Sequence, residues 1–298
     1  PGSGRGKGAF PQARVLALCE AGSHVLWRWQ AKPCRRSEVA IAPVLLRHLE
    51  PDMLLMQDKA FLCCKHARLV RARGAHLLAR VKSGFVLPSR KELPDGSFLS
   101  TLHPRSNASR REREKGGVPV RLIEHVLRGT GHKDDGKPQR LLTTLLDHEE
   151  HPAEELVLLY HERWEEEMAI DELKTHLLRR PVLRSRTPAG VVQEIDGLLL
   201  AHFVVRKLMQ EAAASKGLDP DRVSFTGTLG ILRNRLPEAP RPVSKSEVWT
   251  IKSTFGNAGF FCLSANANLA IFSASRSVPW TSRMTTSVFS LARFGKRA

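Results

Sequence analysis

The residues best suited to chemistry lie between positions 160 and 174, where the sequence is YHERWEEEMAIDELK, the densest acidic segment of a basic chain. On an α-helix, with about 100° between successive residues, four side chains fall within roughly 60° of one another: Tyr160, Arg163, Glu167 and Lys174. Glu172 falls on the opposite side. One helix face therefore presents an aromatic hydroxyl, two cations and a carboxylate. Spacing alone leaves one alternative open, a solvated helix with an ion pair between Arg163 and Glu167.

The charge of the whole chain indicates its partners. Of 298 residues, 47 are Lys or Arg and 30 are Asp or Glu, which gives a formal net charge of +17. Clustered cations raise the local potential and neutralise phosphates, so this charge favours nucleic acid as the partner. The alternative is that the surplus Arg only keeps the protein in solution. With 42% hydrophobic residues, the chain can also bury a sizeable core.

The cysteines and the hydropathy pattern indicate the cellular location. Cysteines occur at five scattered positions, without the spacing of a disulfide framework or of a zinc site. No uninterrupted apolar run approaches the ~18 residues of a transmembrane helix. We therefore expect a cytoplasmic protein that does not contact a membrane.

The first 82 residues predict the start of an α/β core. Two apolar runs around Gly22 predict a β-hairpin. Helical and strand patterns then alternate: a helix over 38–49 capped by Ser37, a strand over 53–57, a helix over 61–73 and a strand over 76–82. In α/β folds of this kind, functional residues lie at the carboxyl ends of strands. Asp58 directly follows the strand expected over 53–57.

Three further regions follow this first part of the core. Residues 83–156 alternate turn residues with short strand-like runs, which predicts a β-rich insertion. Helical periodicity returns afterwards, so residues 157–237 are expected to complete the core. Residues 238–298 are rich in Ser and Thr, and no Asp or Glu follows Val248. We interpret this tail either as a basic DNA-contacting segment or as a disordered or non-native extension.

The spacing Tyr-x2-Arg-x3-Glu-x6-Lys at 160–174 resembles the signature of bacterial insertion-sequence family four transposases, which belong to the DDE class. The sequences GRGKGAFPQARVLAL near the start and LLMQDKAF at 54–61 are similar to segments around the second acidic residue of that family. The resemblance covers residues 1–235 and does not extend into the tail. It implies an RNase H-like core, a mixed sheet flanked by helices, with a β-rich insertion before the Glu-bearing helix.

Position by position, the resemblance makes Asp58 the second catalytic Asp and Glu167 the catalytic Glu. It implies that these carboxylates hold Mg²⁺ or Mn²⁺ ions, which serve DNA cleavage and strand transfer. It also implies that Tyr160, Arg163 and Lys174 contact DNA phosphates. The implied partners are the inverted-repeat ends of the transposon, target DNA and a second copy of the chain. The implied location is the bacterial cytoplasm, in association with the nucleoid.

The chain also departs from the family pattern. No Asp in a matching context precedes Asp58, so we expect the first catalytic Asp to be missing and the chain to be truncated at its N-terminus. Asp171 shares a helix face with Glu167 and is a candidate replacement, and Lys59 replaces the Arg usual after the second Asp. Three hypotheses stay open: a transposase that is incomplete as given, a catalytically inactive DNA-binding or inhibitory fragment, and a product without a stable fold.

Overall fold

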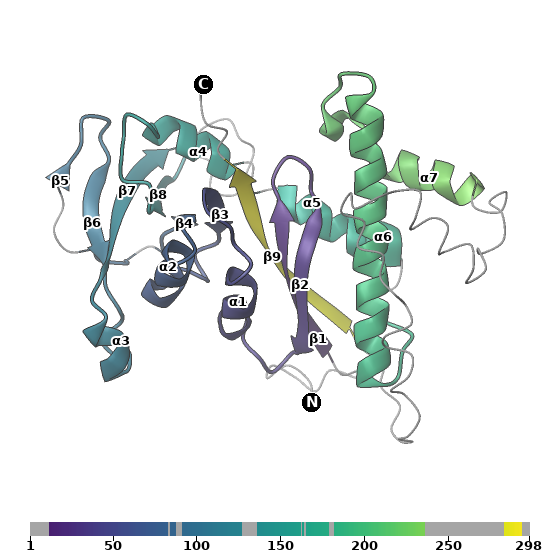
Figure 1. Ribbon diagram of the computed structural model, residues 1–298, viewed down its shortest axis with the longest axis horizontal. Helices are drawn as coiled ribbons and strands as arrows, with labels where there is room; N and C mark the ends of the chain where they lie inside the picture. The colour runs from purple at the N-terminus through teal and green to yellow at the C-terminus, as the bar shows by residue number, and fades with distance from the viewer. Residues whose placement is uncertain are drawn as a thin grey trace.

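The computed structural model describes residues 12–82, 84–87, 91–126, 136–161, 163, 165–178, 182–235 and 283–293, without the side chains of 165–167 and 283–293. The elements, in chain order, are β1 (Gln12–Glu20), β2 (Leu26–Pro33), α1 (Glu38–Leu46), β3 (Met53–Gln57), α2 (Cys64–Arg71), β4 (His76–Arg80), β5 (Lys91–Glu92), β6 (Phe98–Leu102), α3 (Arg110–Glu114), β7 (Val118–Val126), β8 (Pro138–Thr143), α4 (Ala153–His161), α5 (Glu165–Asp171), the π-helix η2 (Glu172–Leu178), α6 (Pro188–Ala214), the 3₁₀-helix η3 (Pro220–Arg222), α7 (Phe225–Arg235) and β9 (Arg283–Arg293). The described strands form one nine-stranded sheet in the order β2-β1-β9-β3-β4-β8-β7-β6-β5 (Figure 1).

The first elements follow the local sequence signals. Strands β1 and β2 pair antiparallel, which confirms the expected hairpin, and its turn places Gly22 at φ +80°, a conformation that glycine adopts at little cost. Ser37 caps α1 by accepting a hydrogen bond from the backbone N–H of Ala40 at 3.3 Å. Helix α2 is shorter than expected because Phe61 belongs to the turn that follows β3 rather than to the helix.

Helices cover both faces of the sheet. On β1, Leu16 and Leu18 belong to the apolar cluster that packs against α1 and α2. Their neighbours Val15 and Ala17 point to the other face, where they pack against α5, η2 and α6. This alternation buries β1 on both sides, as expected for a central strand. The structure confirms the expected α/β class with a mixed sheet flanked by helices.

The strands between residues 83 and 156 extend this sheet at one side. Strands β5, β6, β7 and β8 pair antiparallel in turn, and β8 pairs with β4. Arg121 on β7 is fully buried beneath them and donates hydrogen bonds to Ser97 Oγ and the His151 carbonyl, each at 2.7 Å. It also pairs with the Asp95 carboxylate, so this part of the sheet encloses a charged group with its counter-charge.

Strand β9 lies in the middle of the sheet although it comes from the end of the chain (Figure 1, yellow). It pairs parallel with β1 from Gln12 to Glu20 and antiparallel with β3 from Met53 to Met56. The rest of the expected tail before this strand, 238–282, lies outside the described residues. The two strands β1 and β3 are therefore joined through β9.

Helix α6 is the longest helix in the described part of the chain, at 27 residues. By length and composition it is also the one described helix that could cross a membrane, which is weak evidence because core helices pass the same test. Its residues Val191, Ile195 and Leu199 are buried against the β1–β2 hairpin. Figure 1 shows α6 standing beside β2, with α7 on its other side.

Candidate functional site

Strand β3 and helix α4 meet through a buried hydrogen bond. The hydroxyl of Tyr160 donates to the backbone carbonyl of Gln57 at 3.2 Å. The Tyr160 side chain packs in an apolar cluster with Leu54 and Met56 of β3, and the residue is 8% exposed. Because Asp58 follows Gln57 in the chain, this contact places the beginning of the 160–174 segment beside the carboxyl end of β3.

Asp58 occupies the end of β3 with an available carboxylate. The residue is half-buried, and its backbone carbonyl accepts a hydrogen bond from the N–H of Phe61 at 3.0 Å. Within the described part of the chain the Asp58 carboxylate accepts no hydrogen bond, so the carboxylate does not cap the turn. The adjacent Gln57 amide is fully buried without a hydrogen-bond partner among the described residues. Such unpaired buried polar groups are uncommon and mark this strand end as a candidate functional position.

The segment 160–174 is not one continuous α-helix, which corrects the projection made from sequence. Helix α4 ends at His161, α5 runs from Glu165 to Asp171, and η2 continues as a π-helix. A π-helix contains more residues per turn than an α-helix, so positions after Asp171 no longer follow a spacing of about 100°. Glu167 lies in α5, and its side chain is outside the described atoms. The ion pair considered between Arg163 and Glu167 would involve this side chain, so it too lies outside the described atoms.

The two predicted cations differ in their surroundings. The guanidinium carbon of Arg163 lies 5.5 Å from the centroid of the Tyr160 ring, within cation–π range. Lys174 is half-buried in η2, and burial lowers the pKa of its ammonium group. Lys174 forms no ion pair with any side chain that the structure describes. A partly desolvated cation without a counter-charge is well suited to bind an anion.

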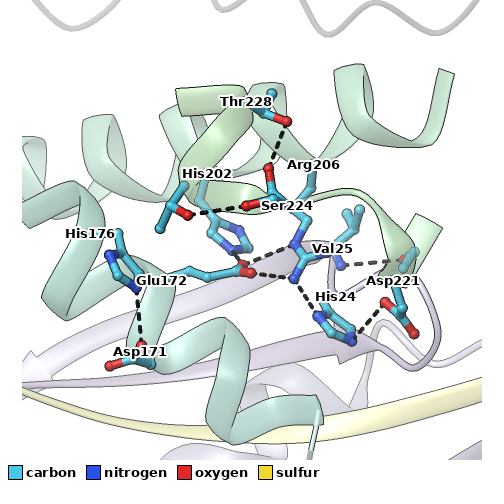
Figure 2. A network of polar contacts seen from close by, with 12 residues as sticks. His24, Val25, Asp171, Glu172, His176, His202, Arg206, Asp221, Ser224 and Thr228 are labelled. Carbon is cyan, nitrogen blue, oxygen red and sulfur yellow. Dashed lines mark hydrogen bonds and ion pairs between the residues drawn. The ribbon is translucent and has the colours of Figure 1, made fainter. Parts of the chain in front are cut away.

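The acidic residues after Glu167 have partners of their own. Asp171 is exposed, accepts a hydrogen bond from Thr175 Oγ1 at 2.6 Å and lies 3.3 Å from His176 Nε2. Glu172 is buried and contacts His202 and Arg206 of α6 (Figure 2). Sequence analysis missed this buried network, because its partners are distant in sequence. The signal that could have indicated it is the spacing of His202 and Arg206, four residues apart on one helix face.

Asp58 at the end of β3 and Glu167 in α5 have the donor chemistry of a divalent metal site. Asp58 and Glu167 both supply carboxylate oxygens, the donors that Mg²⁺ and Mn²⁺ prefer. Across the described side chains, no group of three or more His, Cys, Asp or Glu lies close enough to hold a metal ion. Of Asp58 and Glu167, the structure describes the side chain of Asp58.

Comparisons with known proteins identify the family. Residues 1–204 match the family described as "Transposase DDE domain". Transposase InsG for insertion sequence element IS4, from Escherichia coli (strain K12), is 28% identical over 232 residues. That match covers 76% of this chain and 51% of InsG, so the chain spans about half the length of this relative. The cryo-EM structure of the piggyBac transposase synaptic complex with hairpin DNA is similar with a TM-score of 0.37 and 13% identity, over 79% of this chain and 49% of that chain.

The chain belongs to the transposase DDE domain family. The similarity to InsG also confirms the resemblance to insertion-sequence family four that the signature at 160–174 indicated. The matched residues 1–204 include Asp58, Tyr160, Glu167 and Lys174.

Proposed function

We propose that this chain is part of a DNA transposase with an RNase H-like core and carries two of its catalytic carboxylates, and that the whole enzyme cleaves and joins DNA strands at insertion-sequence ends. The observation that carries this proposal is the hydrogen bond from Tyr160 to the carbonyl of Gln57. It ties the signature segment to the strand end that bears Asp58. Family membership supplies the class of reaction, a polynucleotidyl transfer.

In this proposal Asp58 and Glu167 are metal ligands. A bound Mg²⁺ or Mn²⁺ pair would activate the attacking oxygen and stabilise the leaving oxygen of the phosphodiester. Asp58 is supported by its position at the end of β3 and by its available carboxylate. Glu167 is supported by its place in α5, which follows the helix that Tyr160 anchors to β3.

The signature residues bind and orient the DNA backbone. We assign phosphate contacts to Arg163 and Lys174. Lys174 is supported by its half-buried position and by the lack of a described counter-charge. Tyr160 has one hydroxyl proton and gives it to the Gln57 carbonyl. It would therefore donate to a phosphate only after leaving that carbonyl, and its first task is to hold α4 against β3. The net charge of +17 attracts DNA to the chain that carries these residues.

A second candidate function is DNA binding without cleavage, as in an inactive or inhibitory fragment. The observation that favours it is the net charge of +17, which attracts DNA whether or not cleavage follows. Under this hypothesis the same cations bind DNA, and a second copy or an intact transposase is the partner that the fragment inhibits.

One experiment separates these functions. Supercoiled plasmid carrying the inverted-repeat ends is incubated with the full chain in Mg²⁺ or Mn²⁺, and DNA binding is measured in parallel without metal. Metal-dependent nicking that disappears in Glu167→Gln, with DNA binding retained, supports the transposase. Binding without nicking in either metal supports the second candidate. A chain that neither binds nor nicks DNA contradicts both.

A further inference from the structure

The carboxylate of Glu172 is a buried charge at the start of η2. Its side chain is 9% exposed. Glu172 Oε2 accepts hydrogen bonds from Arg206 Nε at 2.9 Å and from His202 Nε2 at 2.8 Å, while Oε1 contacts Arg206 Nη2. Figure 2 shows the carboxylate pointing from the η2 helix into the space between these two side chains of α6. Glu172 therefore joins η2 to α6 through a two-point contact with a planar guanidinium.

The two partners of Glu172 are enclosed by α7. His202 is fully buried and Arg206 is 4% exposed. The Phe225 ring lies 5.6 Å from the His202 ring, centroid to centroid, and its centroid is 5.7 Å from the guanidinium carbon of Arg206. The aromatic ring thus shields the ion pair from water, which strengthens the attraction between its charges.

Arg206 also reaches the hairpin at the start of the chain. Its Nη2 contacts Nδ1 of His24, which belongs to the β1–β2 turn and adopts a left-handed conformation with φ +56°. His24 Nε2 in turn lies 3.5 Å from an Asp221 carboxylate oxygen on η3. Figure 2 shows His24 between Arg206 and Asp221. A single guanidinium therefore links η2 with the hairpin.

The protonation of the network follows from its contacts. Burial raises the pKa of Glu172, but the His202 hydrogen bond and the Arg206 charge more than offset it, so the pKa lies below its ordinary value. Burial lowers the pKa of His202, so its neutral ring donates through Nε2. A buried ion pair contributes little stability compared with apolar residues of the same size. What it does supply is a fixed geometry for the backbone that carries Glu172.

That backbone is the π-helix η2, which also carries Lys174. π-helical turns are rare and occur frequently at functional sites, because they displace side chains from their α-helical positions. Lys174 is two residues after Glu172, half-buried, and without an ion pair to any described side chain. Anchoring Glu172 fixes the direction in which the following turn presents the Lys174 ammonium group.

We propose that Glu172 and Arg206 are positioning residues, which hold η2 so that Lys174 is oriented toward a DNA phosphate. This inference rests on the proposed function, because it takes DNA as the ligand of Lys174. It adds two residues outside the Tyr-Arg-Glu-Lys signature to the machinery of DNA binding.

The test is a double-mutant cycle on DNA affinity, using the full chain and a short duplex DNA as the probe. Glu172→Gln keeps side-chain size and Arg206→Lys keeps the positive charge but not the planar fork, and each is combined with Lys174→Ala. Each variant alone is expected to weaken binding about tenfold. In the Lys174→Ala background, the same changes are expected to alter affinity less than about twofold, because the cation they orient is gone. Glu211→Gln, in an exposed ion pair with Lys207 on the same helix, is the matched control and should leave affinity unchanged.

The outcomes separate this inference from the proposed function. A purely structural role for Glu172 predicts the same fold-loss of affinity with and without Lys174, and that additivity would overturn the inference alone. If wild type fails to bind DNA, the proposed function is wrong. If wild type binds but Lys174→Ala binds as tightly, Lys174 does not contact DNA, and the inference is overturned while the proposed function stands without that contact. Thermal unfolding shows whether each variant folds. If Glu172→Gln lacks a cooperative thermal transition, the same cycle is measured with Arg206→Lys.

Discussion

The hydroxyl of Tyr160 donates a hydrogen bond to the backbone carbonyl of Gln57, although the two residues are 103 positions apart in the chain. The contact spans the whole β-rich region between β4 and α4. It places the helix that begins the signature segment directly against the strand that ends before Asp58. The placement of the 160–174 segment beside Asp58 therefore depends on the buried side chain of Tyr160.

Tyr160→Phe should lower the free energy of unfolding by about 1 kcal/mol, because it removes the buried hydrogen bond to the Gln57 carbonyl while the ring stays in place. Urea unfolding measures the change. Tyr160→Leu should be clearly less stable than Tyr160→Phe, because it also removes ring packing against Leu54 and Met56. A Phe variant as stable as wild type would show that the bond contributes nothing.

Lys174→Ala should weaken DNA binding and reduce the slope of log K against log salt by about 0.9, the value for one lost phosphate contact. The slope is obtained from titrations of duplex DNA at several salt concentrations. Lys216→Ala, an exposed lysine beyond the end of α6, serves as the control and should leave the slope unchanged. An unaltered slope in Lys174→Ala would remove this residue from the DNA contacts.

Asp95→Ala should destabilise the protein by about 3 kcal/mol, because it leaves the fully buried Arg121 guanidinium without its counter-charge. Chemical unfolding again provides the measurement. The control is Glu114→Ala, which breaks the exposed pair with Arg110 at 2.7 Å and should cost less than about 0.5 kcal/mol. Similar losses in the two variants would contradict the buried position of Arg121.

Stability should fall when the pH decreases below 6.5, because burial lowers the pKa of His202 from that ordinary value. Below pH 6.5 the unfolded chain takes up a proton at this position while the folded chain does not, so acid favours unfolding. The lowered pKa of Glu172 acts in the same direction only at lower pH, below its ordinary 4.5. The window between pH 7.5 and 5.5 therefore reports on histidine.

His202→Gln tests this assignment. Glutamine can still donate to Glu172 but does not titrate, so the loss of unfolding free energy between pH 7.5 and 5.5 should shrink by about 1 kcal/mol. Burial also lowers the pKa values of the buried His66 and the half-buried His125, which keep part of the pH dependence. His103→Gln, at an exposed position, is the control. Equal pH dependence in wild type and His202→Gln would contradict a neutral buried His202.

Val288→Pro should destabilise the protein by more than about 2 kcal/mol, because proline removes a backbone N–H from the interior of a sheet. Val288 lies opposite Ala17 in the parallel pairing of β9 with β1. Lys91→Pro, at the start of the edge strand β5, is the control and should be tolerated. Hydrogen exchange of the β1 amides gives a second measurement, and unchanged protection in Val288→Pro would contradict the position of β9.

Much of the fold could be predicted from local sequence signals. Gly22 between two apolar runs predicted the first hairpin, and the apolar run 53–57 predicted the strand that ends before Asp58. Strand β9 could not be predicted, because its Ser- and Thr-rich sequence has weak hydrophobic periodicity and its pairing partners are far away in the chain. The pairing of strands so far apart in the sequence depends on which strand edges the rest of the sheet leaves unpaired.

The sequence could propose the residue types of the candidate site but not their geometry. The sequence pointed to Tyr160, the only tyrosine of the chain, yet its hydroxyl bonds to a backbone carbonyl, a group that every residue carries and that no sequence pattern marks. Projection on an ideal α-helix placed Glu172 on the side opposite Glu167 and gave no indication that it is buried. The structure buries it, because η2 changes the helical period and because α6 supplies His202 and Arg206.

The place of β9 also has a consequence for biosynthesis. A ribosome releases the hairpin β1–β2 and the strands from β3 onward long before residue 283, yet the structure joins these two halves through the last of the described strands. The nascent chain must then carry two open sheet edges until residues 283–293 have been synthesised. Such an intermediate exposes unpaired strand edges, so chaperone protection before β9 enters the sheet would reduce its aggregation.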